Sequence, residues 1–316
     1  MGKLNRIADS NISLIMILAG VIGYASVCCW FFHEEIFQGQ NSFVISGEKN
    51  LFFNENPGYL LWMSSIVIQP VLWFIILIPS STIIRRLKGE LSPEKHIWSS
   101  LILILLMFGI FMIIILLTFE EYLKRPGSFD PEDVKVYDLK SKLLVFTTVG
   151  QIIGLYYMFG AVLVSKVSMK MVEERKYDLL CYRRLKSYLD TVINITAVIF
   201  TLGIISAMLL RNAINNELIY PSEFLISIGI MNSLLILIFY LPTHFTLFYF
   251  GRKILESKFS AVAGENESEM DVLVKQNELS KNLNLSLGIP QSIKTALVIL
   301  SPVISSFIPD VMKILK

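Results

Sequence analysis

The hydrophobic pattern of the chain consists of six long apolar stretches without lysine or arginine, so that all 28 basic residues lie between or beyond them. The stretches cover residues 12–32, 59–83, 97–119, 143–165, 188–210 and 223–248. At a rise of about 1.5 Å per residue, a helix of this length crosses about 30 Å of hydrocarbon. Because a charged side chain in lipid costs about 3 kcal/mol or more, the exclusion indicates membrane spans and not a soluble core. We therefore predict an all-α fold, a polytopic bundle of six transmembrane helices.

The first stretch needs a separate decision, because it follows Lys3 and Arg6 as a signal peptide would. It is longer than a typical signal core, and the bulky segment 28–32 follows where a cleavage site requires small side chains. We therefore expect a first helix that is retained in the protein.

The distribution of basic residues predicts the orientation. The N-terminus and the loops 84–96 and 166–187 together hold 13 lysine and arginine residues, whereas the three alternate loops hold seven. Short loops that are rich in lysine and arginine stay in the cytoplasm. We expect both termini in the cytoplasm, and the protein in a plasma membrane, specifically a bacterial inner membrane.

Three segments outside the apolar stretches have local patterns of their own. Residues 42–53 fit either a β-hairpin or an irregular loop, because two β-prone runs flank a turn-rich tetrad. Asp130 followed by Pro131 is typical of a helix start that leads into the fourth span. The basic segment 166–187 lacks glycine and proline, so we expect a helical hairpin that extends two spans beneath the membrane.

The chain divides into a transmembrane domain, residues 1–250, and a cytoplasmic tail, residues 251–316. We expect the sixth helix to continue past residue 250 and to end near the polar, acidic linker 263–269. In the last segment, 289–315, large apolar residues recur at helical spacing. These residues are Ile289, Ile293, Leu297, Leu300, Ile304, Phe307, Val311 and Ile314. Three prolines interrupt the stripe and its uncharged part is short, so we predict an amphipathic helix at the interface or docked on protein.

Small residues predict where helices pack closely. Gly150 and Gly154 on the fourth span, and Ala19 and Gly23 on the first, have the small-xxx-small spacing that lets helix backbones approach in lipid. On the fourth span the small face consists of Thr147, Gly150, Gln151, Gly154, Ala161 and Ser165. The opposite face, which we expect to meet lipid, consists of Ile152, Ile153, Leu155, Tyr156, Phe159 and Val162. This span should therefore lie at the centre of the bundle.

Polar side chains inside the spans fall at two depths. Gln69, Gln151 and Asn232 each lie eight to ten residues from the outer end of a span, which is about 12–15 Å. Near the cytoplasmic edge lie Asp190, Asn194 and His244.

Each of these groups needs a partner, because an unsatisfied polar group in hydrocarbon costs several kcal/mol. They either form hydrogen bonds between helices or line a narrow hydrated path in which Asp190 pairs with His244.

Composition excludes several functions. With 54% hydrophobic and 17% charged residues the chain is too apolar for an ordinary soluble domain. The 28 basic residues nearly balance the 26 acidic ones, so nucleic acid is not an implied partner. The three cysteines do not suggest a disulfide framework, and the three isolated histidines suggest no metal site. No cofactor is implied.

The sequence favours a protein that acts without catalysing a reaction, since it contains no nucleophile and base in a recognisable arrangement. The leading hypothesis is an oligomeric pore-like component or a signalling or effector component of the membrane. The alternatives are a small-solute secondary transporter and a membrane scaffold or sensor. Besides the lipid bilayer, the expected partners are further copies of the chain or a membrane or cytoplasmic protein.

Overall fold

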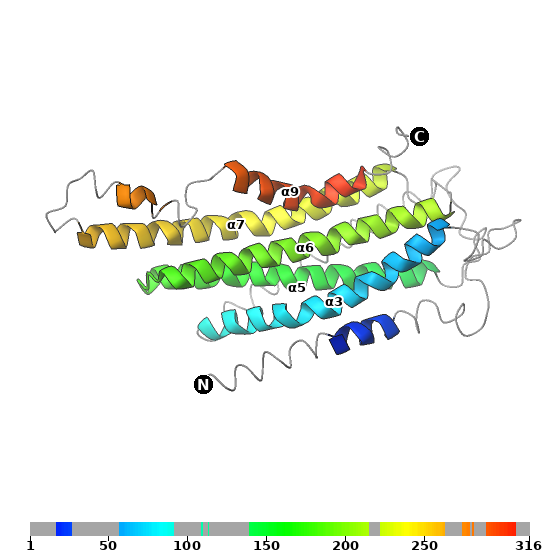
Figure 1. Cartoon of the computed structure of the whole chain (residues 1–316), viewed down its shortest axis with the longest axis horizontal. Coiled ribbons are helices and arrows are strands. Elements are labelled where there is room, and N and C mark those ends of the chain that lie inside the picture. Colours follow the sequence, from blue (N-terminus) through cyan, green and yellow to red (C-terminus); the bar gives the residue numbers. More distant parts are fainter. Residues whose placement is uncertain are drawn as a thin grey trace, which may run out of the picture.

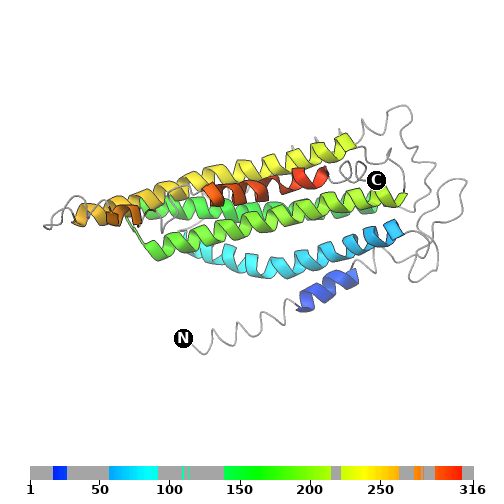
Figure 2. The same cartoon turned by 45° about the horizontal axis from the view of Figure 1, so that its top comes forward.

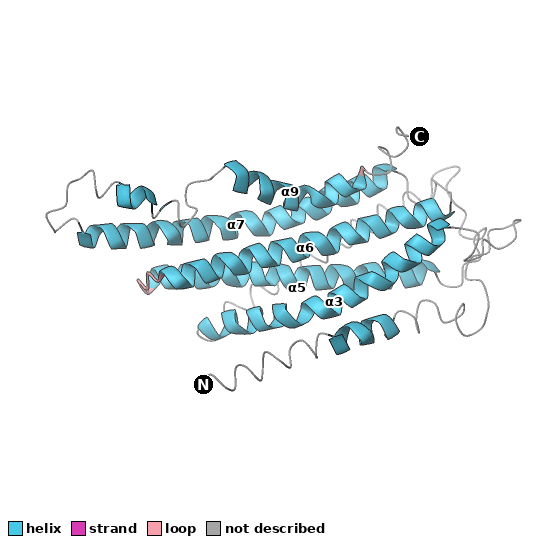
Figure 3. Ribbon diagram, in the orientation of Figure 1, coloured by secondary structure: helices cyan, strands magenta, loops and turns pink. Residues whose placement is uncertain are grey.

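The computed structural model describes residues 17–26, 57–91, 139–214, 222–262, 274–278, 280 and 289–307, and the single residues 109 and 113. These residues are almost entirely helical and include no strand (Figure 3). The main helices are α3 (Pro57–Glu90), α5 (Leu139–Glu173), α6 (Leu179–Ile214), α7 (Ser222–Val262) and α9 (Ile289–Ser306).

Four of these helices, α3, α5, α6 and α7, are long and apolar enough to cross a membrane. They contain the predicted spans 59–83, 143–165, 188–210 and 223–248, which confirms the all-helical, membrane-compatible fold. The first predicted span is described only as a short apolar helix, Ile17–Ser26. Apart from residues 109 and 113, the third predicted span lies outside the described residues. The same holds for the hairpin or irregular loop at 42–53, the helix start at Asp130 and the linker 263–269.

The helices pack side by side along one direction, as both views show (Figures 1 and 2). Helix α5 contacts α3, α6 and α7, and α6 also contacts α9. Of the most apolar stretch of α5, 61% is buried inside the protein, compared with 28% for α3, 50% for α6 and 39% for α7. Helix α5 is thus the most buried of the four, as the predicted central position requires, although α6 contacts one described helix more.

The lipid-facing side predicted for α5 is wrong for two of its members. Leu155 and Phe159 are only 5% and 6% exposed, whereas Ile152 on the same side is 50% exposed. The sequence pattern assumed one protein-facing side, but neighbours on three helices surround α5 and leave only a narrow strip of its surface free.

The two glycines of α5 contact different helices. A Cβ atom at Gly150 would lie 2.9 Å from the Trp73 ring of α3, and one at Gly154 would lie 2.5 Å from the Phe200 ring of α6. In the first helix, a Cβ atom at Gly23 would lie 2.9 Å from the carbonyl oxygen of Pro70, whereas Ala19 is half-buried. The small residues therefore admit large aromatic rings or a neighbouring backbone.

The predicted helical hairpin at 166–187 is confirmed, because α5 continues to Glu173 and α6 begins at Leu179. Asp178 caps α6: its carboxylate oxygens accept hydrogen bonds from the amides of Leu180 at 2.9 Å and Cys181 at 3.2 Å.

At the C-terminus of α5, Arg175 has φ of 52°, and the amide of Lys176 donates to the carbonyl of Met171 at 2.9 Å. This is the αL termination for which glycine is usually favoured.

Glycine should therefore be well tolerated at position 175. A non-glycine residue in the left-handed region carries strain that glycine lacks, offset in part by the greater chain entropy of glycine when unfolded. We expect Arg175→Gly to raise the free energy of unfolding by about 0.5–1 kcal/mol. Arg175→Ala, which loses the same charge but keeps the strain, is the matched control in thermal unfolding in detergent. A glycine variant no more stable than the alanine variant would contradict this account.

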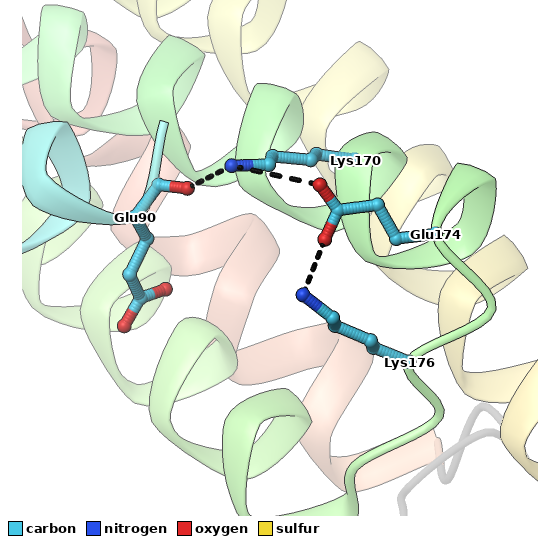
Figure 4. Close-up of polar contacts among 4 residues, drawn as sticks. All are labelled: Glu90, Lys170, Glu174 and Lys176. Carbon is cyan, nitrogen blue, oxygen red and sulfur yellow. Dashed lines mark hydrogen bonds and ion pairs between the residues drawn. The ribbon is translucent and has the colours of Figure 1, made fainter. Parts of the chain in front are cut away.

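A polar network joins the end of α3 to this hairpin (Figure 4). The ammonium group of Lys170 donates to the backbone carbonyl of Glu90 at 2.6 Å, and Arg184 Nη1 lies 3.4 Å from the Glu90 carboxylate. Glu174 accepts from Lys176 at 2.8 Å and pairs with Lys170 at 3.7 Å. The hydrogen bond from Lys176 is the main reason that the pKa of Glu174 is lowered. The small stabilisation that ionised Glu174 gives the folded protein is present above the ordinary pKa of glutamate, and it is lost as the pH falls and Glu174 becomes protonated.

Helix α9 packs on α6 and α7, as the protein-docked alternative for this segment requires, and in Figure 2 it lies between them. Its two prolines do not prevent the helix. Pro290 occupies the first turn, where no amide donor is needed. Pro302 lies in the last turns of the helix, and its carbonyl accepts the Ser305 hydroxyl at 2.8 Å.

Candidate functional site: two polar clusters in the bundle

Side-chain hydrogen bonds join most neighbouring helices of the bundle. The hydroxyls of Ser65 on α3 and Ser206 on α6 are 2.9 Å apart. Between α7 and α5, the Thr246 hydroxyl donates to Ser165 at 3.0 Å, and the Thr243 hydroxyl lies 3.2 Å from the Ala161 carbonyl. Such bonds contribute on average about 0.6 kcal/mol each within a membrane. The smaller hydroxyls thus serve as links between helices.

The first cluster, which we call the amide belt, consists of Gln69, Gln151, Asn232 and Ser233. The three amide side chains are 2%, 7% and 1% exposed. Gln151 Nε2 lies 3.5 Å from Asn232 Oδ1, at the limit of a hydrogen bond, and so connects α5 with α7. Gln69 lies one turn before Trp73, whose ring packs on Gly150, next to Gln151.

The amide belt is incompletely satisfied. Within the described part of the chain, Gln69 Nε2, Gln151 Oε1 and Ser233 Oγ are buried and have no hydrogen-bond partner. Buried polar atoms of this kind are rare, and each needs an explanation such as an ordered water molecule or a stored strain. The belt could therefore hold water between α3, α5 and α7.

The second cluster, which we call the three-helix cluster, lies where α6, α7 and α9 meet, around Asp190, His244 and Thr295. On α7, the Tyr240 hydroxyl is 3.2 Å from His244 Nδ1, and the two rings stack with centroids 5.2 Å apart. Tyr240 is also hydrogen-bonded to Thr295 of α9. Asp190 of α6 interacts electrostatically with three groups on all three helices. These groups are Lys186, His244 and Lys294.

The predicted pairing of Asp190 with His244 is thus an electrostatic proximity, and the hydrogen-bond partner of His244 is Tyr240. Asn194 is exposed on α6 and makes no hydrogen bond to the described residues of the cluster. Sequence reasoning missed Tyr240 and the α9 residues. Tyr240 could have been found, because it lies four residues before His244 and hence on the same helix face.

Asp190 and His244 should behave almost independently. Because the hydrogen-bond partner of His244 is Tyr240, we expect a coupling energy below about 1 kcal/mol between Asp190→Asn and His244→Gln in a double-mutant cycle. Thermal unfolding in detergent of the two single variants and the double variant gives this value. A coupling clearly above this limit would show that the two side chains form a direct buried pair.

The side chains of these clusters support hydrogen bonding and proton exchange. Within the described ranges, no three histidine, cysteine or acidic side chains lie close enough together to hold a metal ion. The amide belt can hold polar groups or water inside the bundle, and the three-helix cluster can hold α9 to α6 and α7.

No protein-family model matches the sequence, and no curated protein and no solved structure is detectably similar to the chain.

Proposed function

We propose that this chain is a multi-pass membrane protein that catalyses no reaction and acts as a signalling or effector component. Its output would be the position of helices that continue from the membrane into the cytoplasm. The proposal rests on one observation, the packing of helices beyond the ends of the predicted spans, on the side that the proposed orientation places in the cytoplasm.

Helices α5, α6 and α7 each extend past the predicted spans on the cytoplasmic side, and α7 does so by 14 residues, which is about 21 Å. The hydrophobic core of the bundle continues into these extensions and the end of α3. Its side chains there, all at most 3% exposed, include Leu87, Val167, Tyr182, Leu185, Phe250 and Ile254. Continuous helices that pack in both environments can carry a displacement from the membrane to a cytoplasmic partner.

The amide belt argues against a pore formed between copies of the chain. A ring of symmetry-related amides requires side chains on the surface of each copy. Gln69, Gln151 and Asn232 are instead buried between helices of one chain. They contribute to packing within the subunit, which agrees with a signalling or scaffold role.

A second candidate function is a narrow path through the single bundle, as in a pore-like protein or small-solute transporter. The observation that favours it is the set of buried polar atoms without partners in the amide belt. Water in the belt would satisfy these atoms and would hydrate the middle of the membrane.

Reconstitution separates the two functions. We expect the purified protein to give neither discrete conductance steps in planar bilayers nor gradient-driven, saturable uptake in liposomes. In cells, a photo-crosslinking residue at Arg183, exposed on the cytoplasmic hairpin, should give an adduct of one defined mass. The same residue at Ile238, 49% exposed on the apolar side of α7, is the control and should give no protein adduct. Conductance or uptake that Asn232→Leu abolishes would establish the second function and refute the first.

The proposed orientation places the N-terminus and the 166–187 hairpin on the cytoplasmic side of a bacterial inner membrane. If the chain has six spans, the C-terminus lies on the same side. The 13 to 7 division of basic residues supports it. In a cysteine-free background, single cysteines at Ser46 and Ser128 should react with an impermeant maleimide from outside. A cysteine at Ser268 should react only after permeabilisation. Reaction of Ser268 from outside would overturn the orientation and the span count.

A further inference from the structure

We propose that α9 is a transmembrane helix that crosses from the cytoplasmic side beside α6 and α7, with its apolar stripe against lipid acyl chains. The chain after Phe307 then emerges on the outer side. This inference takes its orientation from the proposed topology and does not depend on the signalling role.

The contacts of α9 fix its direction and depth. The side chain of Thr295 is hydrogen-bonded to Tyr240 of α7, and Ser306 packs on Gly229 of α7. The two contacts are eleven residues apart on each helix, which corresponds to about 16 Å. Helix α9 therefore runs antiparallel to α7 over at least this distance, about half of the hydrocarbon thickness. The Thr201 hydroxyl of α6 donates to Ser301 at 3.1 Å. Because α6 is itself antiparallel to α7, α9 runs parallel to α6 (Figure 1).

The face of α9 that packs on the bundle combines apolar side chains with small hydroxyl residues. Ile299, Ser305 and Ser306 are 6%, 4% and 1% exposed. A Cβ atom at Gly229 would lie 2.8 Å from the Pro302 carbonyl oxygen, so the two backbones are nearly in contact. The hydroxyls of Ser305 and Ser306 donate to carbonyls three residues earlier, at 2.8 and 2.6 Å, and so need no water. This close approach through small residues is characteristic of helix packing in lipid.

The large apolar residues of α9 point away from the bundle. Leu297, Leu300, Ile304 and Phe307 are 55%, 46%, 49% and 43% exposed. They form the stripe that an amphipathic helix in water would bury against protein. A stripe of large apolar side chains that is left exposed by the bundle is the arrangement expected where the surroundings are hydrocarbon.

A lipid partner is favoured because this stripe continues the one on α7. The contacts of Thr295 with Tyr240 and of Ser306 with Gly229 set the heights of the two helices relative to each other. At these heights, Leu297, Leu300 and Ile304 of α9 lie level with Ile238, Leu234 and Ile230 of α7, which are 49%, 51% and 44% exposed. These residues belong to the exposed apolar side of a helix that is long and apolar enough to span the membrane. The charged Lys294, which is exposed, comes at the opposite end of α9, in the three-helix cluster near the cytoplasmic edge. Acyl chains would meet both stripes at the same depth.

Topology labelling tests where the chain emerges. In the cysteine-free full-length protein, a cysteine at Lys316 should react with an impermeant maleimide in intact cells. A cysteine at Ser268 should remain protected until permeabilisation. Protection of both sites would overturn the seventh crossing and leave the cytoplasmic orientation of residue 268 intact. Reaction of both sites would instead refute the underlying orientation.

Spin labels test the lipid contact directly in reconstituted vesicles. A label at Leu300 should be accessible to oxygen within about twofold of a label at its matched position Leu234, and poorly accessible to a water-soluble nickel complex. A label at Glu256, which is exposed on the cytoplasmic part of α7, gives the aqueous reference. Nickel access at Leu300 like that at Glu256 would place α9 in water. Low access to both reagents would show that a second protein copy covers the stripe. Either result overturns the proposal.

Discussion

Replacing Gly154 by leucine is expected to lower the free energy of unfolding by about 3 kcal/mol, because the new side chain must displace Phe200. A Cβ atom alone would already lie 2.5 Å from the Phe200 ring, and that ring is only 2% exposed at the contact of α5 with α6. Since the ring is packed on its other sides, the two helices must move apart. Unfolding by heat or by a denaturing detergent, with loss of folded protein as the readout, measures the effect.

Two controls separate this clash from the general effect of a leucine. Gly203→Leu on α6 adds the same atoms where no atom lies within 4 Å of the new Cβ, so it should be neutral or slightly stabilising through helix propensity. Ile153→Leu, next to Gly154, keeps the volume and should change stability by less than about 1 kcal/mol. If all three variants lose stability equally, the close contact of Gly154 with α6 is not the reason.

The positions of the spans could be predicted from the sequence because the cost of charge in lipid is large and local. Each predicted span that lies in the described part of the chain is contained in a helix. Helix rotation was less predictable. Gly150 and Gly154 are one turn apart, yet one accepts Trp73 of α3 and the other Phe200 of α6. Such a division depends on how three neighbours share the surface of α5, and a one-helix pattern contains no information about it.

The docking face of α9 was not predictable from its own residues. The sequence correctly indicated a helix with an apolar stripe whose uncharged part is short. The structure docks the other face, through Pro302 and Ser306 against Gly229. Gly229 on α7, far from α9 in the sequence, admits this contact. The rotation of α9 about its axis is therefore a property of α7 and α9 together and not of α9 alone.

For the polar residues too, burial could be predicted from the sequence, but the contacts between them could not. Burial of Gln69, Gln151 and Asn232 follows from their place inside apolar stretches, as expected. Which of them meet does not follow, because one residue of rotation turns a side chain by about 100°. The geometry brings Gln151 to Asn232 and leaves Gln69 Nε2 without a partner among the described residues.

Because Gln151 has a partner and Gln69 Nε2 has none among the described residues, substitutions in the amide belt test whether the belt contains water. If it is dry, Gln69→Leu removes a buried amide with an unpaired donor and should raise the free energy of unfolding by about 2 kcal/mol. Asn232→Leu removes the partner of Gln151, leaves a second amide unpaired and should lower stability by about 1–2 kcal/mol. Thermal unfolding of the two variants in the same detergent gives both values.

In a hydrated belt, water would already satisfy Gln69, so Gln69→Leu would gain nothing and would instead obstruct the path. Opposite signs for the two substitutions therefore favour the packed, signalling bundle. A loss of stability in both variants, together with a loss of any conductance or uptake, would favour the path through the bundle. The sign for Gln69 decides between the two functions, because it reports whether the unpaired amide of this residue is solvated in the folded protein.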